Sequence, residues 1–246
     1  MCRLMGYVAN DATTISEIAG PDFVEFTALS AKHGDGWGIS SNSSGTTKPE
    51  LLVEPGRAKE SSKYSEAVST IASNAALLHL RWATLGLSVT EGNTHPFTFG
   101  DISFIHNGGI KPPKSLDTGI DPKYLAQLRG DTDSERYFYY LLSKIDKSDL
   151  KIGVIDGVRE ISANLDYSSI NAMMMTPEYL VVICEHNNDR IPDDEGTDYY
   201  ELYYRKDERG ILIASTGWNQ NGWTNLPNHH VMFVDRKSQE VEVIAL

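Results

Sequence analysis

The β-strands that the sequence predicts are unevenly spread along the chain, and their distribution constrains the fold more than any other feature. Short apolar runs bounded by Gly, Pro, Asn and Asp predict strands, and apolar residues at helical spacing predict helices. The predicted strands are 3–9, 36–40, 51–54, 76–82, 102–106, 170–176, 179–185, 199–205, 211–214, 230–235 and 240–244. The predicted helices are 21–32, 62–73, 122–128, 134–144 and 150–165. Because the helices precede residue 166 and the strands continue to the end, we expect an α+β fold with large, mostly antiparallel sheets.

The chain is acidic, which argues against two classes of partner. It has 34 acidic and 22 basic residues, a formal net charge of −12 and no basic stripe. Nucleic acid and anionic membrane surfaces are therefore unfavourable partners. No apolar run approaches the ~20 residues that cross a bilayer, and the first residues do not resemble a secretory signal. We expect residues 2–246 to form a single cytoplasmic domain that acts on a small molecule.

The two cysteines, Cys2 and Cys184, have different surroundings in the sequence. A disulfide scaffold is implausible in a large cytoplasmic chain with so few cysteines, and Cys184 lies in an apolar run that predicts a packing role. At Cys2, removal of the initiator methionine leaves a thiol and a free α-amine on one residue. An α-amine has a reference pKa of about 8, so it can act as the base for its own thiol. Taken alone, a cysteine at position 2 is more simply explained by chance.

Polar residues near the ends of two predicted strands could belong to a site. Arg81 ends an apolar run, and its planar fork suits a substrate carboxylate, with the Thr84 hydroxyl nearby. Asn107, Gly108 and Gly109 follow the strand 102–106 and are typical of a turn. An Asn amide and a Gly N–H can equally converge as the donors of an oxyanion hole. The alternative for Arg81 is a surface residue that caps a strand.

Three further segments have both a structural and a functional interpretation. Asp133 or Thr132 is expected to cap a helix, while one carboxylate oxygen of Asp133 remains able to bind a substrate ammonium. His95 is either a ligand contact or a packed, hydrogen-bonded residue, and as an isolated residue it favours packing. The Gly-rich turn 34–38 is expected to bring the backbone close to the strand of Cys2.

Taken in order, six segments resemble the class II glutamine amidotransferases, which are N-terminal-nucleophile (Ntn) hydrolases. They are Cys2-Arg3-Leu4-Met5-Gly6, Gly34-Asp35-Gly36-Trp37-Gly38, Arg81-Trp82-Ala83-Thr84, Asn93-Thr94-His95-Pro96-Phe97, His106-Asn107-Gly108-Gly109 and Asp131-Thr132-Asp133-Ser134-Glu135. The resemblance covers residues 2–145. It implies a four-layer αββα sandwich with two mostly antiparallel sheets.

The resemblance also implies how the glutamyl group is held. Arg81, with Thr84 beside it, resembles the residue that pairs with the substrate α-carboxylate. Asp133 resembles the acid that receives the α-ammonium, with Asp131 as the second candidate. Trp82 and His95 lie in matching motifs and are expected to shape or contact the same pocket.

The implied reaction is hydrolysis of a γ-glutamyl amide, either glutamine or a γ-glutamyl amine or peptide, through a thioester on Cys2. In this resemblance the freed α-amine is the general base, Asn107 and Gly108 form the oxyanion hole, and neither a metal nor another cofactor is needed. Larger members of the family carry a fused synthase domain, which this sequence of 246 residues does not include. The chain therefore resembles the short, free-standing members of ergothioneine biosynthesis and glutathione breakdown. Those short members often have a late Ser-Glu-Pro segment. The comparable stretch here is 214–218, so the leaving-group side of the pocket stays open.

Two other interpretations remain for the same residues. The chain could be a glutaminase subunit that passes ammonia to a separate synthase. It could also be an inactive γ-glutamyl-binding module, which retention of Met1 would favour because a blocked amine cannot act as a base.

Overall fold

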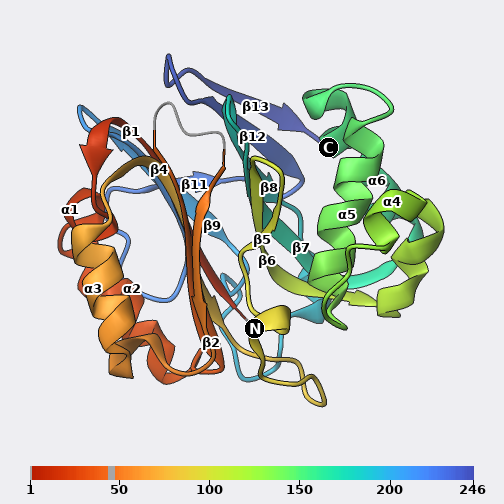
Figure 1. Cartoon of the computed structure of the whole chain (residues 1–246), viewed down its shortest axis with the longest axis horizontal. Coiled ribbons are helices and arrows are strands. Elements are labelled where there is room, and N and C mark those ends of the chain that lie inside the picture. Colours follow the sequence, from red (N-terminus) through yellow and green to blue (C-terminus); the bar gives the residue numbers. More distant parts are fainter. Residues whose placement is uncertain (1, 44–47) are drawn as a thin grey trace.

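The strands form two antiparallel sheets that pack face to face (Figure 1). The computed structural model describes residues 2–43 and 48–246. Sheet A has the order β11-β9-β10-β1-β4-β2-β3, and sheet B has the order β13-β12-β8-β7-β6-β5. The strands of sheet A are β1 (Arg3–Thr13), β2 (Gly36–Asn42), β3 (Glu50–Glu54), β4 (Ser73–Arg81), β9 (Leu202–Asp207), β10 (Gly210–Ser215) and β11 (Thr224–Leu226). Those of sheet B are β5 (Phe97–Phe99), β6 (Ile102–Lys111), β7 (Asp166–Met175), β8 (Tyr179–Cys184), β12 (His230–Asp235) and β13 (Val241–Ala245).

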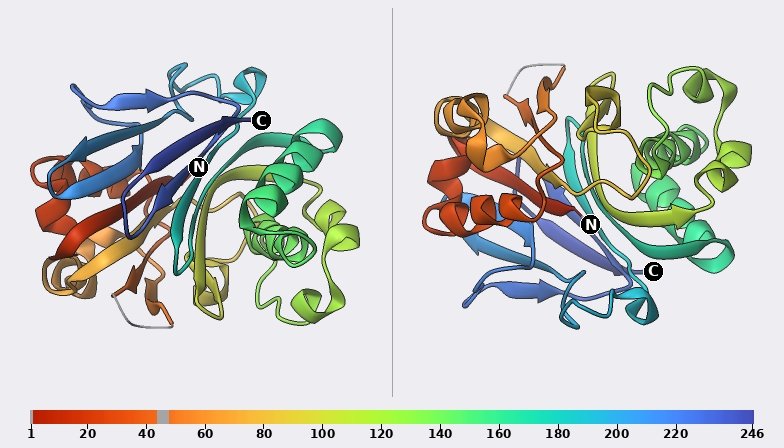
Figure 2. Two further views of the ribbon diagram at one scale, coloured as in Figure 1. Left: turned by 90° about the horizontal axis from the view of Figure 1, so that it is seen from above. Right: turned by 90° about the horizontal axis from the view of Figure 1, so that it is seen from below.

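Helices cover the outer face of each sheet, which completes four layers (Figure 1). Sheet A is covered by α1 (Ile15–Ala19), α2 (Asp22–Ala28) and α3 (Ser62–Thr70), and sheet B by α4 (Pro122–Leu125), α5 (Asp133–Ile145) and α6 (Leu150–Asn164). Short 3₁₀ turns join them: η1 (Leu29–Ala31), η2 (Ala58–Glu60), η3 (Glu91–Asn93), η4 (Pro113–Gly119) and η5 (Asn188–Arg190). The views from above and from below show the two sheets side by side, with the helices of each on its outer side (Figure 2).

Three hydrophobic clusters correspond to the three spaces between the four layers. The cluster between the sheets includes Leu4, Leu77 and Ile105. Met5 and Leu80, on the opposite face of sheet A, pack in the cluster under α1–α3. A third cluster lies between sheet B and the helices α5 and α6. Alternate residues of an extended chain point to opposite faces, so Cys2, directly before β1, shares the inner face with Leu4, while Arg3 and Met5 share the outer one.

The expected αββα sandwich is confirmed, with differences at several element boundaries. A five-residue helix, α1, follows Thr14, whose hydroxyl and Glu17 form a capping box. The predicted helix 21–32 ends as α-helix at Ala28 and continues as the 3₁₀ turn η1. Strand β1 extends beyond the apolar run to Thr13 and pairs there with Ser73. The predicted packing role of Cys184 is confirmed, because it is buried between the sheets.

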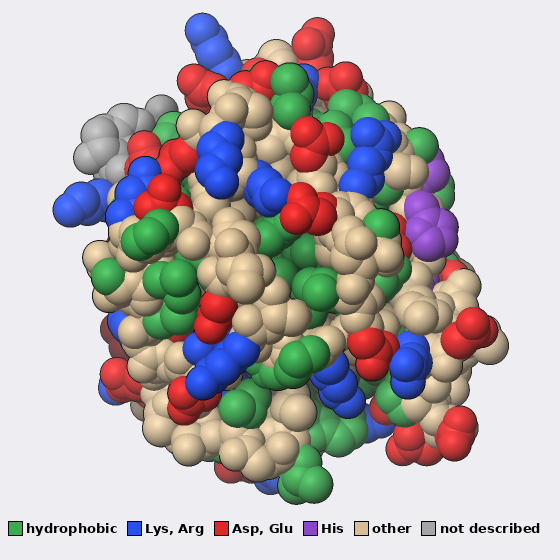
Figure 3. Space-filling model, turned by 90° about the vertical axis from the view of Figure 1, so that its right-hand side faces the viewer, with side chains coloured by type: hydrophobic (Ala, Val, Ile, Leu, Met, Phe, Trp, Pro, Cys, Tyr) green, Lys and Arg blue, Asp and Glu red, His purple; other side chains and the backbone are tan. Residues whose placement is uncertain are grey.

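The surface over α4–α6 carries acidic and basic side chains interspersed with apolar ones (Figure 3). Within residues 2–43 and 48–246, no helix is long and apolar enough to cross a membrane.

Candidate active site

Cys2 lies at the start of β1, a central strand of sheet A between β10 and β4. The Leu4 backbone N–H donates to Ser215 Oγ over 3.0 Å, which ties the beginning of β1 to the end of β10. The Cys2 thiol donates to the Trp82 carbonyl oxygen at 3.8 Å. Burial raises the pKa of this thiol, and the charge of Arg81 opposes that rise. The thiol therefore needs a base if it is to react near neutral pH.

The end of β4 brings Arg81 beside Cys2, since β1 and β4 are paired up to Leu80. The Arg81 side chain is only 2% exposed. Its Nη2 donates to the Ser88 carbonyl oxygen over 3.1 Å, while its buried Nη1 has no partner in the described part of the chain. One arm of the guanidinium is thus anchored and the other is available to an anion.

A Gly-rich turn holds the end of β4 in place. The Asp35 N–H donates to the Arg81 carbonyl oxygen over 3.0 Å, and Asp35 Oδ2 accepts from the Ala83 N–H over 2.8 Å. The expectation that this turn approaches the Cys2 strand is wrong, because β4 lies between β1 and β2. The close approach is instead to the loop before β5, where a Cβ on Gly38 would lie 2.1 Å from the His95 carbonyl oxygen.

Asn107 and Gly108 lie on β6, in the sheet opposite Cys2. Both polar atoms of the Asn107 side chain are buried without a hydrogen-bond partner among the described residues. Asn107 shares the inner face of sheet B with Ile105, so it faces the same inter-sheet layer as Cys2. A Cβ on Gly108 would lie 1.7 Å from the Ser169 carbonyl oxygen, which excludes any side chain there. An unpaired buried amide is costly, and its nitrogen is a donor without an acceptor.

Asp133 is the first residue of α5 and links that helix to β6. Thr132 is the N-cap, because its hydroxyl accepts from the Glu135 N–H over 3.1 Å. Asp133 Oδ2 accepts from the Ile110 N–H over 2.8 Å, and the side chain is 8% exposed. One carboxylate oxygen is therefore structural, and the second remains for a ligand.

Three buried histidines stand behind this region, and burial keeps them neutral. It lowers the pKa of His79 to about 3 and also lowers the pKa values of His95 and His106. His79 Nε2 donates to the His106 carbonyl oxygen over 3.2 Å, and His106 Nε2 donates to the Ser169 carbonyl oxygen over 3.3 Å. His106 Nδ1 is then the acceptor for the Ser134 hydroxyl, 2.8 Å away.

His95 is packed, yet it also faces the site. Its ring stacks on His79 at 4.1 Å between centroids. The expected hydrogen bonds are absent: within the described residues neither ring nitrogen of His95 has a partner. His95 also lines the cavity beside Cys2, so the two interpretations of this residue are compatible.

One small cavity joins most of the residues that the sequence singled out. Its lining includes Cys2, Arg81, Trp82, Thr84, His95, Gly108 and Asp133. The Asn107 side chain does not line it and is buried next to Gly108. Sequence reasoning missed the role of Asn93, whose amide donates to the Ser88 carbonyl oxygen over 3.2 Å and accepts from the Asp131 N–H over 3.0 Å. The one feature of the sequence that pointed to Asn93 was its place in the motif that contains His95.

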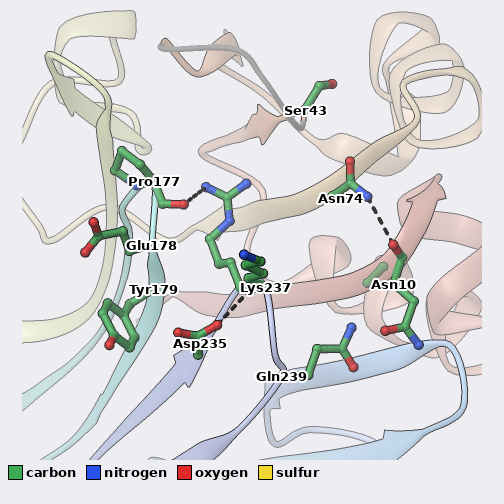
Figure 4. A pocket seen from close by; sticks show the side chains of 11 residues that line it. Asn10, Ser43, Asn74, Pro177, Glu178, Tyr179, Asp235, Lys237 and Gln239 are labelled. Carbon is green, nitrogen blue, oxygen red and sulfur yellow. Dashed lines mark hydrogen bonds between the residues drawn. The ribbon is translucent and has the colours of Figure 1, made fainter.

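A larger cavity lies at the opposite end of the sandwich (Figure 4). Asn10, Asn74, Arg236 and Gln239 line it, and it contains no cysteine or histidine. Arg236 donates to the carbonyl oxygens of Thr176, Pro177 and Asn42, at 2.7, 3.2 and 3.1 Å. Through these bonds Arg236 joins sheet B to sheet A. Among residues 2–43 and 48–246, no group of three or more His, Cys, Asp or Glu is placed to hold a metal ion.

The family model of the class II glutamine amidotransferases matches residues 1–242. The chain belongs to the class II glutamine amidotransferases. An uncharacterized protein of Methanocaldococcus jannaschii is 30% identical, with 94% of this chain and 68% of that protein covered. The probable glutamine amidotransferase DUG3 of Saccharomyces cerevisiae is 36% identical over 34% of this chain and 25% of its own length, so the match spans a quarter of the yeast protein.

Solved structures support the same Ntn-hydrolase fold. The class II domain protein of Silicibacter pomeroyi has a TM-score of 0.70 at 16% identity, with 100% of this chain and 99% of that chain covered. This likeness concerns the fold alone, because the sequences have diverged so far. The family membership makes this amidotransferase an Ntn-type enzyme.

Proposed function

We propose that this amidotransferase hydrolyses a γ-glutamyl amide through a γ-glutamyl thioester on Cys2. The observation that carries the proposal is that Cys2, Arg81, Gly108 and Asp133 reach one small cavity from β1, β4, β6 and α5. A nucleophile, a carboxylate clamp, an N–H donor and an ammonium partner are what a γ-glutamyl head group requires.

The glutamyl group is bound at its two charged ends. The unpartnered Nη1 of Arg81 pairs with the α-carboxylate, and the Thr84 hydroxyl adds a second donor. The free oxygen of Asp133 receives the α-ammonium. His95, neutral because burial lowers its pKa, offers ring nitrogens to the same polar head, and Trp82 forms a wall of the pocket. These contacts leave the side-chain amide next to Cys2.

Acyl transfer starts once Met1 has been removed. The freed α-amine takes the thiol proton, and the Cys2 sulfur attacks the γ-carbonyl carbon, whose C=O electron pair moves to oxygen. We assign the stabilisation of that oxyanion to the Gly108 backbone N–H, which reaches the cavity, and to the Asn107 side-chain N–H, which has to turn toward the cavity from its buried position beside Gly108. When the intermediate collapses, the C–N bond breaks and the leaving amine takes the proton from the α-ammonium. Water then cleaves the thioester with the amine again as base, which releases glutamate and restores the thiol.

Trapping the acyl intermediate tests this proposal. Enzyme lacking Met1 is incubated with glutamine and with a panel of γ-glutamyl amines and dipeptides in the presence of hydroxylamine. Attack by hydroxylamine on the thioester yields a γ-glutamyl hydroxamate and free Cys2. We expect glutamate without hydroxylamine, hydroxamate with it, and neither product from Cys2→Ala. Glutamate release that persists in Cys2→Ala would contradict the mechanism. Transfer of the released ammonia to a separate synthase stays a prediction. It would be supported if adding a synthase partner increased the rate of glutamine hydrolysis by this chain.

A further inference from the structure

Arg3 is a buried cation directly after the nucleophile. Its side chain is 4% exposed, and burial lowers the pKa of its guanidinium. Arg3 lies opposite Leu80 across the β1–β4 pair, and Leu80 packs under α1–α3. Residues directly opposite in antiparallel strands point to the same face, so Arg3 lies on the outer face of sheet A and Cys2 on the inner one.

The partners of this cation do not explain its burial as a purely structural feature. Arg3 Nη1 donates to the Cys2 carbonyl oxygen over 3.0 Å, and its Cζ lies 4.5 Å from the centre of the Tyr199 ring. Its Nε has no hydrogen-bond partner, and no carboxylate lies within 4.0 Å of it, in the described part of the chain. A buried charge without a direct ion pair is costly, and Tyr199 and the charge of Glu195 offset part of that cost.

Segments that are distant in sequence enclose the first residues of β1. Tyr199 is fixed by its N–H bond to the Gly196 carbonyl oxygen at 3.0 Å. The Thr216 hydroxyl donates to the Asp198 carbonyl oxygen over 3.0 Å, and Ser215 Oγ accepts from the Leu4 N–H over 3.0 Å. The loop before β9 and the end of β10 thus hold the Arg3 guanidinium against the Cys2 carbonyl group.

We propose that Arg3 is a positioning residue for the nucleophile, which rests on the proposed function: it holds the Cys2 carbonyl group and so fixes the direction of the freed α-amine relative to the strand, while the thiol is held at the Trp82 carbonyl oxygen. A hydrogen bond to that carbonyl fixes the peptide plane after Cys2 and therefore the rotation about its Cα–C bond. The α-amine of a processed chain is a chain end without a preceding residue to orient it.

The charge of Arg3 has a second consequence for the α-amine. A nearby positive charge disfavours the ammonium form, so a larger fraction of the amine is the free base at neutral pH. In the described part of the chain, Cys2 interacts electrostatically with Arg81 from β4, Asp133 from α5 and Tyr199 from the loop before β9, and Arg3 interacts with Tyr199 and Glu195 from that same loop. Glu195 also pairs with Lys32, so its negative charge is shared between Lys32 and Arg3 and offsets only part of the Arg3 charge.

The test compares Arg3→Met, which removes the charge, with Arg3→Lys, which keeps it. Arg205→Met is the matched control, because Arg205 is also partly buried on sheet A but bonds Asp22 and the Ile18 carbonyl oxygen. Intact mass first establishes that Met1 is absent from each protein. The readout is the rate at which Cys2 is alkylated by 6-diazo-5-oxo-L-norleucine, a glutamine-like probe whose diazo group is replaced by sulfur with release of N₂, from pH 5 to 9.

We expect Arg3→Met to be alkylated about tenfold more slowly at pH 7, with the acid limb of the profile about one pH unit higher. Arg3→Lys should keep the acid limb of the wild-type pH profile but recover only part of the alkylation rate. Arg205→Met should keep the wild-type acid limb and the wild-type alkylation rate. Arg3→Met could instead keep the wild-type alkylation rate and acid limb and differ only in a lower melting temperature. In that case Arg3 is structural and the proposal is overturned. If Arg3→Met does not fold, a wild-type rate in Arg3→Lys overturns it instead. Failure of the wild-type protein to react overturns the proposed function and this inference together.

Discussion

The two ends of the sandwich are built from the same strands but use their polar groups differently. Strands β1 and β4 run from the Cys2 cavity to the larger cavity at the opposite end. At the Cys2 end, Arg81 Nη1 and both polar atoms of Asn107 are buried without partners in the described part of the chain. At the opposite end, Arg236 donates to three carbonyl oxygens and ties the two sheets together. The opposite end also has buried polar atoms without partners among the described residues, Asn42 Oδ1 and Gln239 Nε2, so the inter-sheet bonds of Arg236 are what distinguish it from the Cys2 end.

This difference has an energetic meaning. A buried polar group without a partner costs about 1–3 kcal/mol, so the Cys2 end lowers the stability of the empty protein. Natural proteins tolerate such a cost where binding or catalysis recovers it. Substitutions at the Cys2 end should therefore change activity more than stability, and substitutions at the opposite end should do the reverse.

The largest effect is expected for Cys2→Ala. Removing the nucleophile should lower kcat by at least about 10⁴-fold, while the melting temperature changes little because the thiol makes one long contact of 3.8 Å. The assay measures glutamate release. Cys184→Ala is the control, since its buried thiol lies between the sheets and should affect stability alone. Comparable losses of glutamate release in both variants would show that Cys2 is not the specific nucleophile.

Asn107→Ala should separate activity from stability most clearly. Loss of one oxyanion donor lowers kcat by about 10²–10³-fold. Because the Asn107 amide has no partner among the described residues, its removal should not lower the free energy of unfolding and could raise it by about 1 kcal/mol. Urea unfolding and kcat are measured together, with Asn74→Ala at the opposite end as control. Near-normal turnover in Asn107→Ala would show that its assigned role is wrong.

Arg81→Met should weaken substrate binding. Loss of the carboxylate clamp is expected to raise KM by about 10- to 100-fold, the equivalent of about 1.5–3 kcal/mol for a charge-assisted hydrogen bond. The same change should be seen with glutamine and with longer γ-glutamyl substrates, because all share the α-carboxylate. A lower kcat with an unchanged KM would instead place Arg81 outside the carboxylate site.

Acid should destabilise the Cys2 end before the other end. Burial lowers the pKa of His79 to about 3, so the unfolded chain binds a proton that the folded chain does not. This contribution to stability is complete above about pH 6.5 and is lost as the pH falls toward 3, with about 2 kcal/mol already lost at pH 5. Hydrogen exchange at pH 7 and pH 5 should show amides near residues 79–81 losing protection first. An equal loss of amide protection near Arg236 would contradict the expectation that acid destabilises the Cys2 end first.

The smallest effect is expected for Arg236→Met. Losing the carbonyl bonds that join the sheets should lower the free energy of unfolding by about 1–2 kcal/mol, with kcat/KM per folded molecule unchanged. Arg205→Met, which breaks an ion pair with Asp22 elsewhere on sheet A, is the matched control. A change in kcat/KM caused by Arg236→Met alone would show that the two ends are coupled.

The sequence predicted the parts that depend on local pattern. Apolar runs and helix caps predicted the strands and helices, the family resemblance implied the four layers, and the candidate site residues lie in motifs at the ends of those runs. The structure brings Cys2, Arg81 and Asp133 to one cavity from elements that are far apart in the chain. Strand order could not be read from local pattern, which is why the Gly-rich turn was assigned to the wrong neighbour.

Other features depend on tertiary contacts that a pattern does not contain. The polar end of β1, up to Thr13, is a strand only because Ser73 pairs with it. The burial of Arg3 against the Tyr199 ring depends on contacts between segments that are distant in the chain. The unpaired state of the Asn107 amide is likewise a property of the packed sheets.

The central claim, that a processed Cys2 attacks a γ-glutamyl group, is tested most directly by mass spectrometry after incubation with 6-diazo-5-oxo-L-norleucine. We expect a chain that lacks Met1 and carries one adduct, mapped by peptide analysis to Cys2 and absent from the buried Cys184. Excess glutamine should slow its formation. A chain that has lost Met1 but takes no adduct, or takes it at another residue, would contradict the claim.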